Sequence, residues 1–212
     1  MSVEVELKLA LVEPERLDAL LAALPAPTSV VEQHNHYFVD DTRAAGATSL
    51  AAMVRVRETW RATAGGLVRD EITLTVKRRR QAEGGVFVSD EHEQPLDAAL
   101  WAAIRVGTAP LDEIAGPAMA WLRAQGPTGP LRLQGAMKNR RHLIALHDFA
   151  LEVDRTEYPD GTVDAEVEVE TGDPEAARVV VERAAAAAAI RLVPQTLGKY
   201  ARFLTHGGSP AS

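Results

Sequence analysis

The stretch VEVELKLA, residues 3–10, alternates apolar and charged side chains. This period of two predicts a β-strand with one apolar and one charged face. The charged face carries two carboxylates and an ammonium group, from Glu4, Glu6 and Lys8. A solvent-exposed strand can carry such charges without any function. Whether these three residues form a site therefore depends on the other strands.

Several further stretches alternate in the same way, but each places mainly one sign of charge on its polar face. The acidic faces comprise Glu152 and Asp154 in one strand, and Glu166, Glu168 and Glu170 in another. The basic faces comprise Arg55 and Arg57, Lys77 and Arg79, and Lys138 and Arg140. Like charges on one strand face repel each other slightly, so this segregation has no local stability rationale.

A closed barrel with its charged faces turned inward gives the segregation a purpose. The lumen would then have an acidic wall and a basic wall. Clustered carboxylates without cysteine favour Mg²⁺ or Mn²⁺, and clustered Arg and Lys favour a polyphosphate. A metal that bridges carboxylates and phosphate oxygens would reconcile the two walls.

The order of elements favours an α+β domain built on an antiparallel sheet or barrel. Turn signals at Gly84-Gly85 and Asp160-Gly161 indicate hairpins. Helices are predicted at 14–24, twice within 97–125, from Pro174 after an Asp173 N-cap, and at 197–204. We expect one domain over residues 1–206 and a flexible tail at 207–212.

Composition narrows the function further. The chain has 212 residues, 46% hydrophobic residues, no cysteine and a formal net charge of −7. The negative charge argues against binding to nucleic acid or anionic membranes, although the run at 77–80 is basic. No apolar run is long enough for a membrane span, and no secretory signal is evident, so we expect a cytoplasmic protein. The oligomeric state stays open between monomer and homodimer.

In order along the chain, nine motifs resemble those of the CYTH family, the triphosphate tunnel metalloenzymes. The family's E-x-E-x-K signature stands here at residues 4–8. The others are HYFVDD, VRVRE, LTVKRR, DEHEQPL, MKNRR, LEVDRTEY and AEVEVET, and LGKYARF resembles the C-terminal S-K-Y segment. The last segment departs from the pattern because Gly198 stands where serine is common, while Lys199 is retained.

The resemblance implies an eight-stranded antiparallel β-barrel, the triphosphate tunnel, with helices packed around it. It also implies Mg²⁺-dependent (or Mn²⁺-dependent) hydrolysis of inorganic triphosphate to pyrophosphate and phosphate. Family members also act on thiamine triphosphate or RNA 5′-triphosphates, and some are class IV adenylate cyclases. A polyphosphate-binding module without enzymatic activity is a further alternative.

The resemblance and the charge pattern together suggest roles for individual residues. The expected metal ligands are Glu4, Glu6, Asp154, Glu168 and Glu170, with Glu152 and Glu166 as the next candidates. The expected catalytic residues are Glu4, Glu6, Lys8, Glu168, Glu170 and Lys199. The expected substrate-binding residues are Lys8, Arg55, Arg57, Lys77, Arg79, Glu91, Lys138, Arg141 and Lys199.

Two assignments remain open at this point. Strand alternation groups Arg140 with Lys138, whereas the family motif selects Arg141, and a bulge after Lys138 would settle the conflict. Glu91 and Glu93 would orient either the basic partners of the terminal phosphate or the attacking water, or would simply be exposed.

Overall fold

The computed structural model of the chain describes residues 2–40, 52–126 and 129–207. The tail predicted at 207–212 lies outside these residues, apart from Gly207. The strands are β1 (Ser2–Leu11), β2 (Ser29–Asp40), β3 (Met53–Thr63), β4 (Gly66–Glu83), β5 (Val86–Pro95), β6 (Leu131–Leu146), β7 (Phe149–Glu157), β8 (Val163–Glu170) and β9 (Leu192–Pro194). The helices are α1 (Leu17–Ala23), α2 (Ala98–Arg105), α3 (Pro117–Ala124), α4 (Pro174–Ala187) and α5 (Lys199–Thr205).

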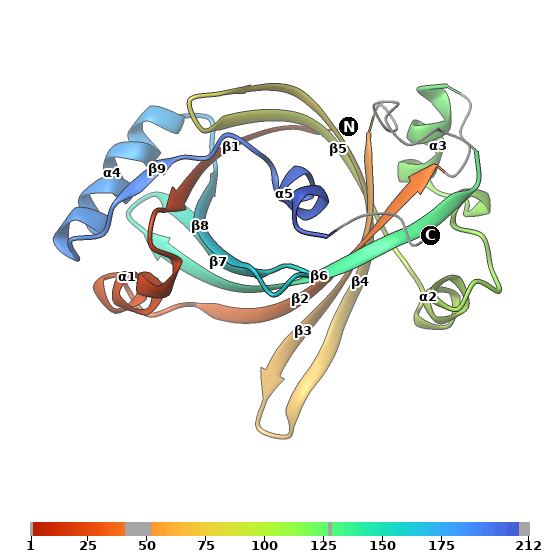
Figure 1. Cartoon of the computed structure of the whole chain (residues 1–212), viewed down its shortest axis with the longest axis horizontal. Coiled ribbons are helices and arrows are strands. Elements are labelled where there is room, and N and C mark those ends of the chain that lie inside the picture. Colours follow the sequence, from red (N-terminus) through yellow and green to blue (C-terminus); the bar gives the residue numbers. More distant parts are fainter. Residues whose placement is uncertain (1, 41–51, 127–128, 208–212) are drawn as a thin grey trace.

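Eight antiparallel strands close into a barrel, as predicted (Figure 1). The strand order is β5-β4-β3-β2-β6-β7-β8-β1, and β1 closes the ring by pairing with β5. In this closing pair Glu4 lies opposite Ser89, while on the other side Lys8 lies opposite Glu168. The short strand β9 pairs with β1 beyond the end of β5, at Leu9–Leu11. The stretch quoted first is therefore the strand that closes the barrel.

The apolar faces of the strands point outward and are covered by helices. One core packs β3 and β4 residues such as Val56 and Leu74 against Trp101 of α2 and Met119 of α3. A second core packs the apolar faces of β1, β7 and β8 against α1 and α4. Figure 1 shows these two helix pairs on opposite flanks of the barrel. Because the apolar faces are satisfied on the outside, the charged faces are left to line the interior.

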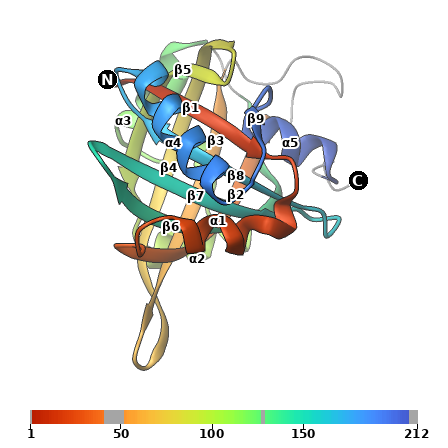
Figure 2. The ribbon, with the colours of Figure 1, turned by 90° about the vertical axis from the view of Figure 1, so that its left-hand side faces the viewer.

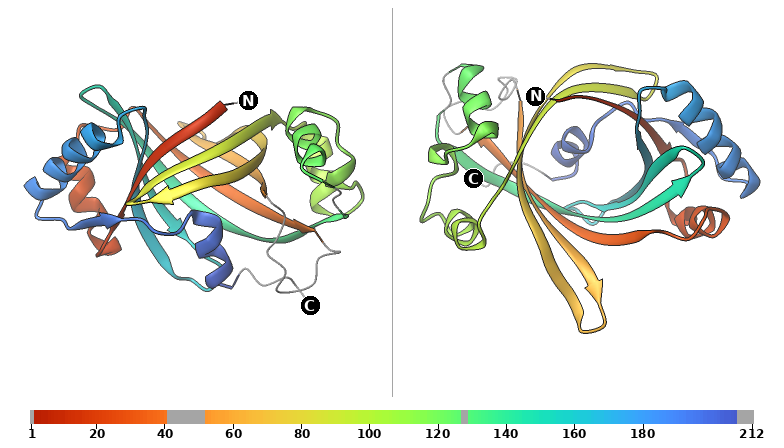
Figure 3. Two further views of the ribbon diagram at one scale, coloured as in Figure 1. Left: turned by 90° about the horizontal axis from the view of Figure 1, so that it is seen from above. Right: turned by 180° about the vertical axis from the view of Figure 1, so that it is seen from behind.

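The helix α5 lies across one end of the barrel (Figures 1 and 2). It is held there by Phe203, which is fully buried against the inward-facing Tyr37 of β2, Met137 of β6 and the nearby Tyr158. Figure 3 shows from two further sides that α5 stays at this end, and that the tip of the β3–β4 hairpin projects away from the barrel. The interior is thus covered at one end by a helix.

Local sequence explains where several elements begin. The Asp173 carboxylate accepts a hydrogen bond from the backbone N–H of Ala176, and Pro174 takes the first position of α4, as predicted. The helix predicted at 14–24 begins instead as a 3₁₀ turn, Pro14–Arg16, before α1. In the described ranges, no helix is long and apolar enough to cross a membrane.

Candidate active site

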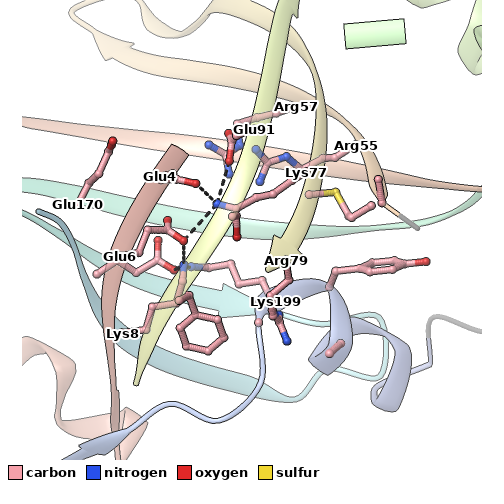
Figure 4. Close-up of a pocket in the computed structure, with 18 of the residues that line it drawn as sticks. Glu4, Glu6, Lys8, Arg55, Arg57, Lys77, Arg79, Glu91, Glu170 and Lys199 are labelled. Carbon is pink, nitrogen blue, oxygen red and sulfur yellow. Dashed lines mark hydrogen bonds and ion pairs between the residues drawn. The ribbon is translucent and has the colours of Figure 1, made fainter. Parts of the chain in front are cut away.

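The barrel encloses a cavity of about 720 Å³ that is lined by charged side chains from seven strands and α5 (Figure 4). The acidic lining residues are Glu4, Glu6, Glu91, Glu93, Glu152, Glu168 and Glu170. The basic lining residues are Lys8, Arg55, Arg57, Lys77, Arg79, Arg141 and Lys199. The fold thus gathers in one chamber most of the residues that alternation and the family motifs selected.

One cluster of carboxylates surrounds the ammonium of Lys77 (Figure 4). Lys77 Nζ contacts Glu4, lies 3.1 Å from Glu6 Oε2 and 2.8 Å from Glu91 Oε2. Burial and the neighbouring carboxylates of Glu6 and Glu91 raise the pKa of Glu4 to about 9. Glu4 therefore keeps a proton at neutral pH, because one ammonium does not neutralise three buried carboxylates.

A second cluster surrounds the ammonium of Lys199 at the start of α5. Lys199 Nζ contacts Glu166 and lies 2.7 Å from Asp154 Oδ2 and 2.8 Å from Glu168 Oε1. The Arg141 guanidinium binds two of these carboxylates, at 2.6 Å from Asp154 and 2.8 Å from Glu168. Burial alone would raise the pKa of Glu168, but the charges of Lys199, Lys8 and Arg141 hold it well below its usual range.

The arginines from β3 and β4 are held differently. Arg57 Nε donates to the amide oxygen of Asn35 at 2.9 Å, and Arg57 forms no ion pair within the described residues. Arg55 donates to Thr75 at 3.1 Å and lies 3.8 Å from Glu93. Burial and the charges of Arg55 and Arg141 lower the pKa of Arg57 to about 10. This part of the cavity is therefore short of negative charge.

Arg79 is the third loosely held arginine. Its guanidinium stacks on the Phe87 ring, 4.9 Å from the ring centroid, and within the described residues it forms no ion pair. A β-carbon at Gly198 would lie 2.2 Å from Arg79 Nη2, so the glycine at this position leaves room for the guanidinium. Glycine, at the position where the family commonly has serine, thus leaves the space that the Arg79 guanidinium occupies.

The structure resolves the open choice on β6. Met137, Asn139 and Arg141 are buried and face inward, whereas Lys138 and Arg140 are exposed on the outside. The pairing of β6 with β2 runs without a shift from Lys138 to Arg141, so no bulge follows Lys138. The prediction that Lys138 lines the cavity is therefore corrected: strict alternation puts Arg141 inside and Lys138 outside.

Two acidic residues lie at the margin of the cavity. Glu170 is exposed, lies opposite Glu6 in the β1–β8 register, and forms no ion pair within the described part of the chain. Figure 4 shows it apart from Glu4 and Glu6. Glu93 is also exposed and accepts a hydrogen bond from Thr75 at 2.8 Å. The structure thus brings Glu4, Glu6 and Glu91 together, but not Glu170 or Glu93 with them.

Two buried residues of the site were not selected from the sequence. Asn35 is fully buried and shares the inward face of β2 with Gln33 and Tyr37, so alternation along β2 was the available signal. Arg202 is buried and binds Glu166 at 2.7 Å and Asp164 at 2.8 Å. It follows Lys199 by three residues on α5, which places both cations on one helix face.

The carboxylate clusters fit a hard divalent cation. Oxygen atoms of Asp154, Glu166 and Glu168 lie within 4.8 Å of one another, and the described part of the chain offers only oxygen donors in this group. The proton retained on Glu4 shows that the other cluster also has more carboxylate than Lys77 neutralises. The cluster around Lys77 is thus short of positive charge, which a divalent cation would supply, whereas Lys8, Arg141 and Lys199 already pair with the carboxylates of the second cluster.

Comparison with known proteins places the chain in a family. The CYTH domain model matches residues 2–197, so the chain belongs to the CYTH domain family. None of the curated proteins compared with the chain matches it.

Solved structures share the fold. The Hippeastrum protein HpAC1, described as a putative adenylyl cyclase with a dominant triphosphatase activity, superposes with a TM-score of 0.81 at 22% identity, over 95% of each chain. A putative adenylate cyclase from Bacillus halodurans gives a TM-score of 0.69 at 24% identity, over 96% of this chain and 99% of the other. The PH1819 protein from Pyrococcus horikoshii gives 0.59 at 13% identity, over 94% and 98%.

Proposed function

We propose that the chain is an enzyme that hydrolyses inorganic triphosphate to pyrophosphate and phosphate in the presence of Mg²⁺ or Mn²⁺. The observation that carries the proposal is the charge balance of the cavity: its described lining has seven acidic and seven basic side chains. Even with Glu4 protonated, this lining leaves only a small positive excess, which attracts a highly charged anion weakly by itself. Binding a triphosphate there requires divalent cations, and the carboxylate clusters supply ligands for them.

In this proposal the two walls have different tasks. Glu4 and Glu6 would hold one metal ion, and Asp154 and Glu168 a second, with Glu170 available because it has no ion pair among the described residues. Arg55, Arg57 and Arg79 would bind phosphate oxygens, because their guanidinium groups are not already held by strong ion pairs. Lys8, Lys77, Arg141 and Lys199 would maintain the carboxylate clusters and contact the substrate at their edge.

The proposed hydrolysis is a direct attack by water, without a covalent intermediate. A water oxygen attacks the terminal phosphorus, the bridging P–O bond breaks, and its electron pair leaves with pyrophosphate. The bound metal would lower the charge on the phosphate oxygens and favour this in-line displacement. The arginines stabilise negative charge on the transferred phosphoryl group and on the leaving group. In this proposal Glu93, which is exposed to solvent and lies 3.8 Å from Arg55, would accept a proton from the attacking water.

An organic triphosphate is a second candidate. At the α5 end the cavity lining includes Tyr37 and Tyr200, whose ring centroids are 4.9 Å apart, together with Met53 and Leu204. These apolar surfaces would suit the base or ring of a nucleotide or of thiamine triphosphate. The triphosphatase activity described for the Hippeastrum protein supports hydrolysis, and its description as a putative cyclase keeps the nucleotide alternative relevant.

The test is phosphate release from tripolyphosphate, ATP and thiamine triphosphate, each with Mg²⁺, Mn²⁺ or EDTA. We expect fast, metal-dependent release from tripolyphosphate and slow release from the other two. Preferential turnover of ATP or thiamine triphosphate, or formation of cAMP, would replace inorganic triphosphate with an organic substrate. Binding of tripolyphosphate that persists in EDTA, without turnover in either metal, would instead indicate a polyphosphate-binding module.

A further inference from the structure

Asn35 is a buried amide directly behind a cavity arginine. It lies on the inward face of β2, is fully buried, and is opposite Arg57 in the β2–β3 register. Its side-chain oxygen accepts a hydrogen bond of 2.9 Å from Arg57 Nε. Burying a polar side chain costs free energy unless it forms a hydrogen bond, and the hydrogen bond from Arg57 offsets this cost for Asn35.

Asn35 carries no charge, and this distinguishes Arg57 from Arg141, the buried arginine of the cavity. Arg141 is bound by the carboxylates of Glu152, Asp154 and Glu168, which neutralise it. Asn35 instead fixes Arg57 through Nε without adding negative charge. The two terminal nitrogens of Arg57 have no hydrogen-bond partner among the described residues, and they form the planar fork that binds phosphate oxygens.

We propose that Asn35 is a positioning residue, which aims the Arg57 fork into the cavity while leaving its charge free for a phosphate group. This inference rests on the proposed function, because it assumes that a triphosphate is the anion bound. The surroundings of Arg57 support it, since Arg55 and Arg141 lie close enough to oppose its charge. A bound phosphate would relieve this repulsion, whereas a carboxylate at position 35 would compete with the phosphate.

A second buried amide in the same barrel provides a matched control. Asn139 of β6 is 1% exposed, donates to Gln33 Oε1 at 2.9 Å and accepts from Thr156 at 3.0 Å. Among the described residues, its side chain contacts no cation of the cavity. Loss of Asn139 therefore removes two side-chain hydrogen bonds, one more than loss of Asn35, without affecting an arginine.

The experiment measures tripolyphosphate binding by calorimetry in Mg²⁺, the steady-state constants, and the melting temperature of each variant. Asn35→Asp keeps the shape and the acceptor but pairs with Arg57, so we expect the Kd to rise about 10- to 100-fold without a loss of melting temperature. Asn35→Ala should raise the Kd about 10-fold by releasing the fork. Asn139→Ala should lower the melting temperature while its Kd stays within about twofold of the wild type.

A double-mutant cycle separates positioning from general stability. In an Arg57→Ala background, Asn35→Asp should have almost no further effect on the Kd, because its partner is gone. Wild-type affinity in Asn35→Asp, or an equal effect of Asn35→Asp with and without Arg57, would overturn the inference. Wild-type protein that binds tripolyphosphate without turnover would contradict the proposed hydrolysis alone, whereas wild-type protein that does not bind it would overturn both.

Discussion

The lysines and the β3–β4 arginines of the cavity differ in how their charges are met. Lys77 and Lys199 each contact three carboxylates, and Lys8 contacts Glu6 and Glu168. Arg57, in contrast, is held by an amide, and within the described residues it forms no ion pair. The lysines therefore belong to a network of ion pairs inside the protein. The arginines are the cations that remain available for an anionic substrate.

This difference implies that the lysine network contributes mainly to stability, whereas the β3–β4 arginines contribute mainly to substrate binding. Removing a member of this ion-pair network leaves the charges of its buried partners uncompensated, which lowers the free energy of unfolding. Removing a cation whose charge is not neutralised relieves repulsion and costs mainly affinity. Variants of the network should therefore lose both stability and activity, whereas variants of the unpaired arginines should lose activity with little change in stability.

The largest effect is expected for Glu168→Gln. Lys8, Arg141 and Lys199 all contact this carboxylate, so its loss leaves three buried cations with one fewer partner. We expect a loss of about 3–5 kcal/mol in the free energy of unfolding, measured with urea. Phosphate release should fall about 100-fold or more, because a proposed metal ligand and the network around it are lost together.

The control for Glu168→Gln is Glu157→Gln on β7. Glu157 is exposed and lies 3.7 Å from Arg155, so its loss should change stability by less than about 0.5 kcal/mol. Turnover by Glu168→Gln at the wild-type rate in saturating Mg²⁺ would remove Glu168 from the acidic wall.

A pair of arginine variants tests the comparison itself. Arg141→Gln should weaken tripolyphosphate binding and also lower the free energy of unfolding by about 3 kcal/mol, because Asp154 and Glu168 lose a partner. Arg57→Gln should lower kcat/KM by about 100-fold with a stability change within about 1 kcal/mol. Equal stability losses in both variants would contradict the distinction between the two groups.

The smallest effect is expected for Lys138→Ala. Its side chain is exposed on the outer face of β6, so stability and kcat/KM should both stay near the wild-type values, with a stability change within about 0.5 kcal/mol. The measurement is a urea titration and a tripolyphosphate assay beside Arg141→Gln. A large loss of affinity in Lys138→Ala would return this residue to the binding site.

The barrel was predictable because its strands alternate apolar and charged residues so regularly. Leu7 and Leu9 alternate with Glu6 and Lys8, and the structure confirms that the two leucines face the helices outside the barrel. For Lys138 the prediction was wrong because alternation grouped it with Arg140 on a charged face that points outward in β6, and no bulge brings Lys138 and Arg141 to the same side.

Other features depend on contacts between distant segments. Lys77 lies opposite Glu91 in the β4–β5 hairpin, but the sequence does not reveal that Lys77 also meets Glu4, because Glu4 arrives only when β1 closes the barrel against β5. Asn35 was missed for a related reason. Alternation along β2 could have placed Asn35 on the inward face, but its contact with Arg57 appears only in the β2–β3 register.

The most direct test is the affinity of the wild-type protein for tripolyphosphate, measured by calorimetry in Mg²⁺ and again in EDTA. The cavity lining has equal numbers of acidic and basic side chains, so metal must supply the positive charge that the anion needs. We predict binding at least about 100-fold weaker in EDTA than in Mg²⁺, equivalent to about 2.7 kcal/mol or more. Equal affinity in the two conditions would show that the side chains alone bind the anion, and would contradict the account of the two walls.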